Sequence, residues 1–255
     1  MDLSAYRNSR PEQDRTRDLM ALLPCRRGTA LDVGARDGYI SVLLTDHFDS
    51  VIALDLDKPE IEHGKIRCVK GDATALNFPD RSMDLVVCLE VLEHIPTQVL
   101  AKACSELARV AKGHVLVGVP YNQDIRCGRT TCYSCGETNP PWGHVNSFDE
   151  PRLRQLFGSL TMVKTSYVGE SDVRTNALAT WLMDLAGNPY GSYSQDEPCV
   201  HCGEKLKAPP PRTFFQKVST KAALSLTALQ KTLLGRRPHG NWIHVLMENR
   251  SAGGR

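Results

Sequence analysis

Short apolar runs alternate with amphipathic segments along the first two-thirds of the chain. The runs are rich in β-branched residues and are bounded by glycine or polar residues, which is typical of buried strands. Seven runs are expected to be strands: 29–35, 50–57, 65–73, 83–92, 114–121, 161–169 and 242–249. Segments with apolar residues at helical spacing predict helices at 38–48, 97–113 and 147–158. This alternation predicts an α/β fold: a Rossmann-like, seven-stranded, mostly parallel sheet with helices on both faces.

The clearest helical pattern lies in segment 97–113, whose apolar residues share one face: Val99, Ala103, Leu107 and Val110. Thr97 is expected to cap the start of this helix, and Gly113 is expected to end it. Pro151 is expected in the first turn of the helix at 147–158.

The last two expected strands are separated by about 70 residues, far more than a hairpin needs. This stretch contains helix candidates at 175–187 and 213–235, with a proline-rich linker at 208–212. We therefore expect three parts: a core over 1–170 that carries a cysteine loop at 122–146, an insertion over 171–241, and a final strand and tail over 242–255.

The helix candidate at 213–235 is amphipathic and basic. Lys217, Lys221 and Lys231 lie outside its apolar stripe, which comprises Phe214, Val218, Ala222, Leu226, Leu229 and Leu233. Such a helix can pack on the sheet or line an acceptor pocket, or it can lie on an anionic membrane. RNA is a less favoured partner, because aromatic residues are few and no RNA-reading motif is present.

Composition and charge change this picture only in part. The chain is 41% hydrophobic and 24% charged, as soluble globular proteins are, and no apolar run approaches the ~18 residues of a membrane span. The polar start lacks a signal segment, so we expect a cytoplasmic protein, with peripheral membrane contact as an option. The net charge is +2, but residues 205–255 carry +9 and the rest −7, which suggests an anionic partner or a solvated basic surface.

The nine cysteines fall into two groups. Four lie in or beside apolar segments and are expected in the core: Cys25, Cys68, Cys88 and Cys104. Five lie in two polar loops: Cys127, Cys132, Cys135, Cys199 and Cys202. In a reducing compartment such clustering favours a metal over disulfides.

Two C-x-x-C pairs, Cys132/Cys135 and Cys199/Cys202, predict a four-thiolate zinc site. A closed shell of four thiolates leaves no open position, so this zinc is expected to stabilise a lid and not to catalyse. Cys127, His144 and His201 are possible substitutes or neighbours. The alternatives are free surface thiols and a redox pair.

The stretch "LDVGARDG", from Leu31 to Gly38, reads as a strand, a glycine turn and a helix start. Gly34 allows the backbone to turn sharply and approach a ligand. Asp55 ends the next strand about 20 residues later, where a carboxylate can accept hydrogen bonds from two ribose hydroxyls. Arg36 replaces the middle glycine of a dinucleotide motif. This motif alone therefore does not identify which nucleoside cofactor binds.

That evidence is the order of several segments. "LDVGARDG" resembles the D/E-x-G-x-G-x-G motif, "LDLD" the ribose-binding acid, and "GDATALNFPDRSMDLVVCLEVLEHIP" and "HVLVGVP" the later segments of class I S-adenosylmethionine (SAM)-dependent methyltransferases, in the small-molecule, type 11-like branch. The resemblance covers about residues 15–170. It implies a SAM cofactor and methyl transfer.

The resemblance also implies roles for individual residues. It assigns Asp32, Gly34, Ala35 and Gly38 to the methionine portion of SAM, Asp55 to the ribose, Leu56, Asp72 and the amide of Ala73 to adenine, and Leu89 and Glu90 to the side near the sulfonium. Arg36 departs from the family's glycine and leaves the shape of the first loop open. Asp32 and Asp72 could instead cap a turn and a loop.

Two histidines are candidates for the base that a hydroxyl or protonated amine acceptor needs, because imidazole titrates near neutrality. His94 follows the fourth expected strand, and His144 precedes the helix at 147–158. Each could instead be structural, and His144 could bind metal. The "NPPW" at 139–142 resembles the catalytic loop of amino methyltransferases but follows the wrong strand, so its prolines are expected to stiffen the loop, with Trp142 as a packing anchor.

We therefore expect a SAM-dependent methyltransferase with a zinc-stapled lid that acts on a small or lipid-linked molecule, at oxygen. The alternatives are an RNA or protein methyltransferase that docks through the zinc module, and a SAM-fold binding protein that no longer transfers methyl groups.

Overall fold

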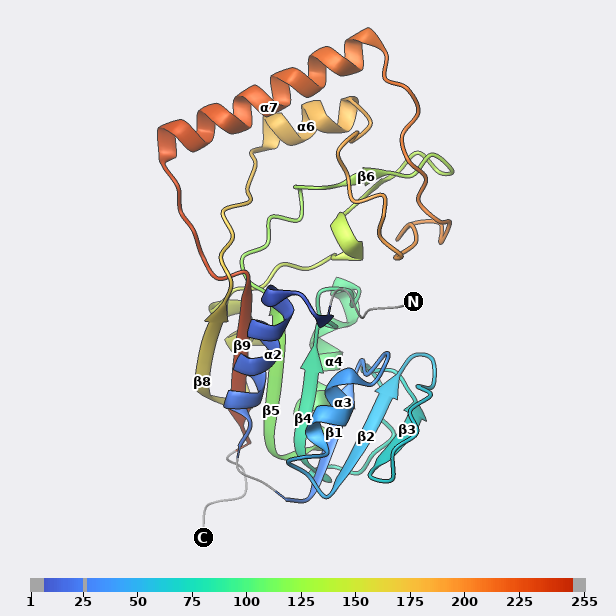
Figure 1. The fold of residues 1–255 in the computed structure, drawn as a ribbon, viewed down its shortest axis with the longest axis vertical. Helices are drawn as coiled ribbons and strands as arrows, with labels where there is room; N and C mark the ends of the chain where they lie inside the picture. The colour runs from blue at the N-terminus through green and yellow to red at the C-terminus, as the bar shows by residue number, and fades with distance from the viewer. Residues whose placement is uncertain (1–6, 25–26, 250–255) are drawn as a thin grey trace. The chain divides into compact units, whose positions relative to one another are not determined.

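The computed structural model describes residues 7–24 and 27–249 (Figure 1). The chain forms two compact units. Unit 1 comprises Met1–Tyr121, Phe148–Gly169 and Gly240–Arg255, and unit 2 comprises Asn122–Ser147 and Glu170–His239. Cys25, which was expected in the core, and the tail residues 250–255 lie outside the described residues.

Unit 1 contains one sheet and four helices among its described residues. The helices are α2 (Arg10–Leu22), α3 (Tyr39–Leu44), α4 (Thr97–Val110) and α5 (Glu150–Leu156). The strands are β1 (Thr29–Val33), β2 (Ser50–Asp55), β3 (Ile66–Lys70), β4 (Met83–Leu89), β5 (Ala111–Pro120), β8 (Thr161–Val168) and β9 (Trp242–Glu248). The sheet order is β3-β2-β1-β4-β5-β9-β8, and β9 runs antiparallel to both of its neighbours. The predicted seven-stranded, mostly parallel sheet is confirmed.

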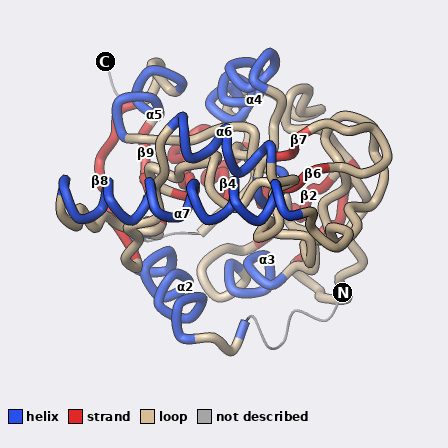
Figure 2. Tube along the Cα trace, turned by 90° about the horizontal axis from the view of Figure 1, so that it is seen from above, coloured by secondary structure: helices blue, strands red, loops and turns tan. Residues whose placement is uncertain are grey.

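Helices cover both faces of this sheet, as the sequence predicts. On one face, α4 and α5 bury Leu107 and Leu153 in the larger apolar cluster. On the other face, α2 and α3 bury Leu19 and Leu44 in the second cluster. Figure 2 shows the two pairs of helices on opposite sides of the strands. The central strands are therefore buried on both faces, which is why they read as continuous apolar runs.

Helix α2 was not predicted from the sequence, although its start carries a signal. Ser9 caps the helix by accepting a hydrogen bond from the Glu12 amide at 3.4 Å, and a proline stands in the first turn. Asp18 then joins the helix to the sheet: its carboxylate accepts from Ser166 Oγ at 2.6 Å and lies 2.6 Å from Nδ1 of the buried His244. The S-x-x-E spacing of Ser9 and Glu12 is the pattern that could have revealed this helix.

Three expected boundaries are wrong. The N-cap position of α4 is Pro96, so Thr97 lies inside the first turn. Gly113 does not end this helix, because α4 stops at Val110 and Ala111 already pairs with Met83 in the sheet. A Cβ on Gly113 would lie 2.7 Å from the backbone oxygen of Asp84, so this glycine allows a close strand approach. The helix expected at 38–48 is shorter, because α3 ends at Leu44.

Unit 2 contains two short strands, a 3-10 turn and a helical hairpin. These are β6 (Thr130–Thr131), β7 (Thr138–Asn139), η1 (Pro141–Gly143), α6 (Ala177–Leu185) and α7 (Phe214–Leu234). The two helices lie side by side and antiparallel, with Asn176 Nδ2 donating to Gln230 Oε1 at 2.7 Å (Figures 1 and 2). Thr213 and Gln216 form a capping box at the start of α7. The expected packing role of Trp142 is wrong, since this side chain is 46% exposed and its φ is 59°.

The apolar stripe of α7 is exposed over most of its length, although Ala222 and Leu226 are half-buried. The helix buries a neighbouring face, where Ser219, Thr220 and Ala223 are small enough for a close approach. Phe214 is 81% exposed, and Val218, Leu229 and Leu233 on the stripe are also exposed. Among the described residues, no helix is long and apolar enough to cross a bilayer.

Candidate cofactor site and candidate metal centre

The residues predicted to bind the cofactor gather at the carboxyl edge of the sheet in unit 1. Asp55 is the last residue of β2, Gly34 follows β1, and Leu89 is the last residue of β4. Asp72 follows β3. Because β3, β2, β1 and β4 are parallel neighbours, their carboxyl ends form one row. This edge is where open α/β sheets bind nucleosides.

The glycine turn after β1 is shaped by two close approaches. Gly34 has φ 82°, and a Cβ there would lie 2.2 Å from Val91 Cγ2. Gly38 has φ 78°, and a Cβ there would lie 2.3 Å from Ile61 Cδ1. Both positions therefore require glycine. The amides of Gly34 and Ala35 donate to the carbonyl of Leu54 at 2.8 and 3.1 Å, which fixes the turn against β2.

Arg36 answers the question of the loop's shape. Its φ of 46° lies in the left-handed region that favours glycine, so this chain makes the turn with an arginine there. The Arg36 amide donates to Asp55 Oδ2 at 2.8 Å, and the Leu56 amide donates to Oδ1 at 2.7 Å. A carboxylate can accept about four hydrogen bonds, so Asp55 keeps capacity for two ribose hydroxyls. Leu56 is 66% exposed beside it, which is an apolar surface for a base to cover.

Asp32 and Asp72 differ in environment. Asp32 is buried at the end of β1 and accepts a hydrogen bond from Ser41 Oγ at 2.6 Å. Burial raises the pKa of its carboxyl to about 6, although the Ser41 bond opposes this. Asp72 is exposed and accepts from the Thr74 amide at 2.7 Å, while Ala73 next to it is buried. Asp32 thus fixes α3 to β1, and Asp72 presents its carboxylate at the surface.

Helix α2 brings a charged network to the end of β4. Glu90 has φ 54°, and its carboxylate accepts from Trp242 Nε1 at 3.2 Å and lies 3.8 Å from Arg15 Nη1. Burial raises the pKa of Glu90, although Arg15 opposes the shift. Arg15 also donates twice to Glu12 at 2.8 Å. Glu12 and Arg15 are functional candidates that sequence reasoning missed with the helix itself.

Glu93 is a second residue that the sequence did not single out. It is completely buried, and neither carboxylate oxygen has a hydrogen-bond partner within the described part of the chain. Burial, and then the nearby Glu90, raises the pKa of Glu93 well above its usual value. The neighbouring His94 is exposed, and its amide donates to the Val91 carbonyl at 3.0 Å.

His144 belongs to unit 2, so the two candidate histidines stand in different units. His144 is buried, and its Nδ1 lies 2.6 Å from Gln123 Oε1. An amide oxygen accepts, so Nδ1 donates in this pair, and the bond to Gln123 orients the imidazole ring.

The four predicted zinc ligands converge in unit 2. The Sγ atoms of Cys132, Cys135, Cys199 and Cys202 all lie within 4.8 Å of one another. Two of the pairs that cross between the loops are 3.7 Å apart. Four sulfurs at about 2.3 Å from a tetrahedral zinc are separated by about 3.8 Å, so these thiols fit that ion.

The two cysteine pairs have the same local structure, "CYSCGE" and "CVHCGE". The amide of Gly136 donates to the Cys132 carbonyl at 2.7 Å, and that of Gly203 donates to the Cys199 carbonyl at 2.9 Å. Both glycines have positive φ, 83° and 75°. The Cys135 amide and then the Ser134 amide lower the pKa of the Cys132 thiol to about 6, which favours the thiolate that a metal binds.

The other candidate ligands are not part of this cluster. Cys127 is not among the converging thiols, and burial raises the pKa of Cys127 to about 12. His201 Nε2 lies 3.2 Å from the Thr138 carbonyl and not at the sulfurs. Among the described residues, this metal-binding group therefore contains the four predicted cysteines alone.

The chain is similar to known methyltransferases. Residues 31–117 match the model of the methyltransferase domain family. A probable S-adenosylmethionine-dependent methyltransferase from Mycolicibacterium smegmatis is 33% identical over 114 residues, which are 42% of this chain and 44% of the relative. A relative with the same description from Mycobacterium tuberculosis is 30% identical over 114 residues, 42% of this chain and 41% of that protein. The chain thus spans less than half the length of these relatives.

Solved structures agree on the fold. A protein from Bacillus halodurans assigned as a methyltransferase superposes with a TM-score of 0.56 at 15% identity, covering 91% of this chain and 97% of that one. A chain from the complex of the Haloferax volcanii Trm112 methyltransferase activator with a methyltransferase gives 0.53 at 13% identity, covering 96% and 92%. The resemblance to class I SAM-dependent methyltransferases is confirmed, in sequence over residues 31–117 and in fold.

Proposed function

We propose that the protein is a SAM-dependent methyltransferase that methylates an oxygen atom of a small or lipid-linked acceptor. The observation that carries the proposal is the row of cofactor-binding candidates along four neighbouring strand ends, centred on Asp55. A turn that keeps its shape without the middle glycine suits SAM, which has no pyrophosphate to cradle. SAM supplies an already activated methyl group when bound.

Each candidate has a part in holding the cofactor. Asp55 accepts from the ribose hydroxyls, and Leu56 covers one face of the adenine. Asp72 accepts from the adenine amino group, and the amide of Ala73 donates to the ring. The turn from Gly34 through Ala35 to Gly38, together with Leu89 and Glu90, surrounds the methionine portion. Asp32 stabilises this turn by accepting a hydrogen bond from Ser41 Oγ.

The protein's remaining tasks are to align the acceptor and to take its proton. Alignment can supply most of the acceleration, because the methyl donor is already activated. A general base adds a factor of about 10²–10⁴. We assign the base to His144 or His94. The contact of His144 Nδ1 with Gln123 Oε1 at 2.6 Å orients the ring of this candidate base.

We propose that zinc at the four cysteines is structural. The sulfur spacing fits a tetrahedral ion, and a shell of four thiolates leaves no position for water or substrate. The ion joins a loop near residue 132 to one near residue 199, and so orders unit 2. Thiolate ligands also fit a protein of the reducing cytoplasm.

The lipid-linked option and a peripheral membrane contact are favoured by the helical hairpin of unit 2. Helix α6 exposes Leu178, Trp181 and Leu185, and α7 exposes Phe214, Phe215 and Val218. Helix α7 contains three lysines and no acidic residue. Exposed aromatic residues beside lysines are the composition of helices that lie on anionic membranes.

Label transfer tests the activity. The full chain, SAM with a labelled methyl group and a total lipid extract should yield label in the organic phase. Asp55→Ala should lower transfer at subsaturating SAM about 10- to 100-fold, because it removes charged hydrogen bonds to the ribose. Asp57→Ala is the matched control, because this fully exposed carboxylate lies outside the site. No transfer to lipid extract or to a polar metabolite extract would contradict the proposal.

Vesicle sedimentation tests the membrane contact. The protein should bind vesicles that contain phosphatidylglycerol more strongly than pure phosphatidylcholine vesicles. Replacing Phe214 and Phe215 by serine should abolish most of the binding, whereas Tyr190→Ser, an exposed aromatic outside both helices, should not. Equal binding by all variants would assign these helices to a protein partner or to solvent instead.

A further inference from the structure

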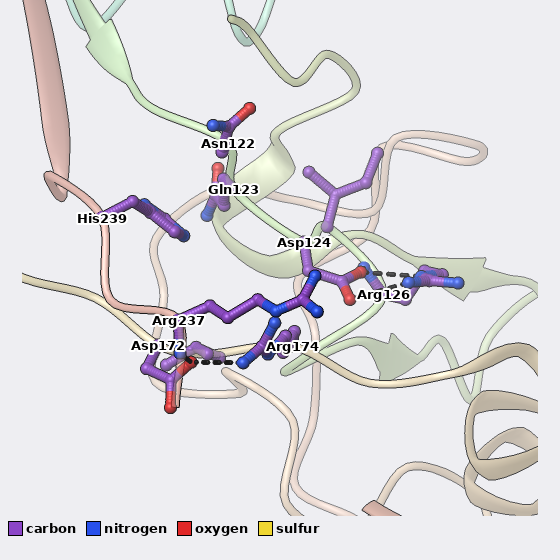
Figure 3. Close-up of a pocket in the computed structure, with 10 residues that line it drawn as sticks. Asn122, Gln123, Asp124, Arg126, Asp172, Arg174, Arg237 and His239 are labelled. Carbon is purple, nitrogen blue, oxygen red and sulfur yellow. Dashed lines mark hydrogen bonds and ion pairs between the residues drawn. The ribbon is translucent and has the colours of Figure 1, made fainter. Parts of the chain in front are cut away.

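A basic pocket of about 630 Å³ lies within unit 2 (Figure 3). Three chain segments line it: 122–126, 172–174 and 237–239. Each segment begins or ends within four residues of a boundary with unit 1, so the pocket is built where the chain leaves the sheet after β5 and β8 and returns before β9. Its size is in the range of small-molecule sites.

The two acidic residues of the pocket are fully engaged. Asp124 accepts from Arg126 Nε at 2.7 Å, from Arg126 Nη2 at 2.8 Å and from the Thr175 amide at 2.9 Å. Burial alone would raise the pKa of Asp124, but these hydrogen bonds hold it below its usual value. Asp172 accepts from the Arg237 amide at 3.2 Å and pairs with Arg174 at 3.1 Å.

The basic residues are not all neutralised by these acids. Arg174 uses Nη2 for both of its recorded bonds, to Asp172 and to the Gly235 carbonyl. The Arg237 guanidinium has no hydrogen bond or ion pair with any residue that the structure describes. Figure 3 shows its side chain extending into the pocket toward Arg174 and Asp124. Arg237 is exposed, so its guanidinium can donate to an anion that enters the pocket from solvent.

The geometry favours a phosphate over a carboxylate. A carboxylate offers two oxygens whose lone pairs lie in one plane, which suits guanidinium forks that approach in that plane. A phosphate offers oxygens in several directions, so it can accept from forks that arrive from two different segments, as Arg174 and Arg237 do. Asn122, Gln123 and His239 add polar side chains to the lining.

We infer that this pocket binds the phosphate group of a phosphate ester, either lipid-linked or soluble, an inference that goes beyond the proposed transferase function. Gln123 lines the pocket and also accepts from His144, so the pocket and one candidate base share a residue.

Calorimetric titration of the full chain with three probes tests the inference: inorganic phosphate, glycerol phosphate and isopentenyl phosphate. We expect one saturable site for the esters. Arg237→Ala should weaken ester binding at least about 10-fold, because it removes charge-assisted hydrogen bonds. Arg237→Lys should be intermediate, since an ammonium cannot form a bidentate pair. Tighter binding of isopentenyl phosphate indicates a lipid-linked ester as the ligand, and equal binding of the two esters indicates a soluble one.

Lys207→Ala is the matched control, because it removes one positive charge from an exposed residue of unit 2 outside the pocket lining. It should leave ester affinity within about twofold. The inference is overturned if neither ester binds saturably, if inorganic phosphate binds alone, or if Lys207→Ala weakens binding as much as Arg237→Ala. SAM affinity should be unchanged in Arg237→Ala. Absence of SAM binding to the unmodified chain would overturn the transferase proposal separately, whether or not the esters bind.

Discussion

The two units of this protein differ in what packs inside each of them. Unit 1 is a sheet whose two faces are covered by helices, and its buried apolar residues form two extended clusters. In the described part of unit 2, the corresponding cluster consists of Cys132, Cys199 and Leu206, with Tyr193 packed against it. Unit 2 meanwhile exposes large apolar side chains on both of its helices.

This difference indicates what orders each unit. Burial of apolar surface can stabilise unit 1 without any ligand. Unit 2 buries too little apolar surface for that, and its loops are joined through thiols that are 64 and 70 residues apart in sequence. Under the proposed zinc site, a metal would take the place of a core in unit 2, as it does in small metal-dependent domains.

Removing the metal should have the largest effect, and only on unit 2. In Cys199→Ser, we expect loss of zinc and loss of amide protection from hydrogen exchange over residues 122–147 and 170–239, with protection kept in the sheet. Structural zinc sites contribute apparent free energies of about 10–16 kcal/mol in small peptides, so the loss should be nearly complete. Cys127→Ser is the control. Cys127 lies outside the cluster, so this variant should keep the zinc. Unchanged protection in zinc-free Cys199→Ser would contradict the comparison.

A cavity in the sheet core should affect unit 1 and spare the metal centre. Leu107→Ala, at a completely buried position of α4, should lower the free energy of unfolding of unit 1 by about 2–5 kcal/mol. Zinc content should not change. Leu229→Ala, on the exposed stripe of α7, should change the free energy of unfolding by less than about 0.5 kcal/mol. A loss of zinc in Leu107→Ala would show that the two units are not stabilised independently.

The buried carboxyl of Asp32 should make unit 1 sensitive to pH. Its folded pKa of about 6 lies above the unfolded value of 3.8, so the folded state holds the proton longer, and this residue's contribution to stability falls as pH rises from about 4 to about 6. Asp32→Asn lacks this titration. Relative to the unmodified chain, the variant should gain up to about 3 kcal/mol in free energy of unfolding across that window and then level off. Denaturant melts at several pH values measure this gain, and a constant difference would refute it.

The smallest effect should come from the start of α7. Thr213→Ala removes the hydroxyl that accepts from the Gln216 amide and should destabilise the helix by about 1 kcal/mol. Faster amide exchange confined to the first turns of α7, with zinc and SAM affinity unchanged, is the expected signature. Thr213→Ser should restore the protection. Exchange equal to that of the unmodified chain would show that the cap is not stabilising.

Most of unit 1 could be predicted because its signals are local. Continuous apolar runs and glycine turns define β1, β2 and β4, and parallel topology then brings Gly34 and Asp55 to one edge. Helix α2 was missed because it contains mostly polar and charged residues, and its role depends on contacts such as Asp18 with His244, 226 residues away. Glu93 was missed for the same reason, since only the fold buries it.

In unit 2, the sequence predicted the metal ligands, because the spacing of their cysteines is typical of a zinc site. The two C-x-x-C pairs identified the four converging thiols across a long gap. The orientation of α7 could not be predicted, because an apolar stripe does not reveal whether it faces a core or solvent, and Ser219 and Ala223 face α6 instead. The pocket around Arg237 has no sequence motif, because three separate segments form it.

Calorimetric titration of the full, zinc-containing chain with SAM and with S-adenosylhomocysteine tests the central claim most directly. We predict one site per chain for each ligand, with SAM affinity about 10- to 100-fold weaker in Asp55→Ala and unchanged in Arg237→Ala. The absence of saturable binding of either ligand to the unmodified chain, or equal affinity in Asp55→Ala, would contradict the assignment of this edge of the sheet to the cofactor.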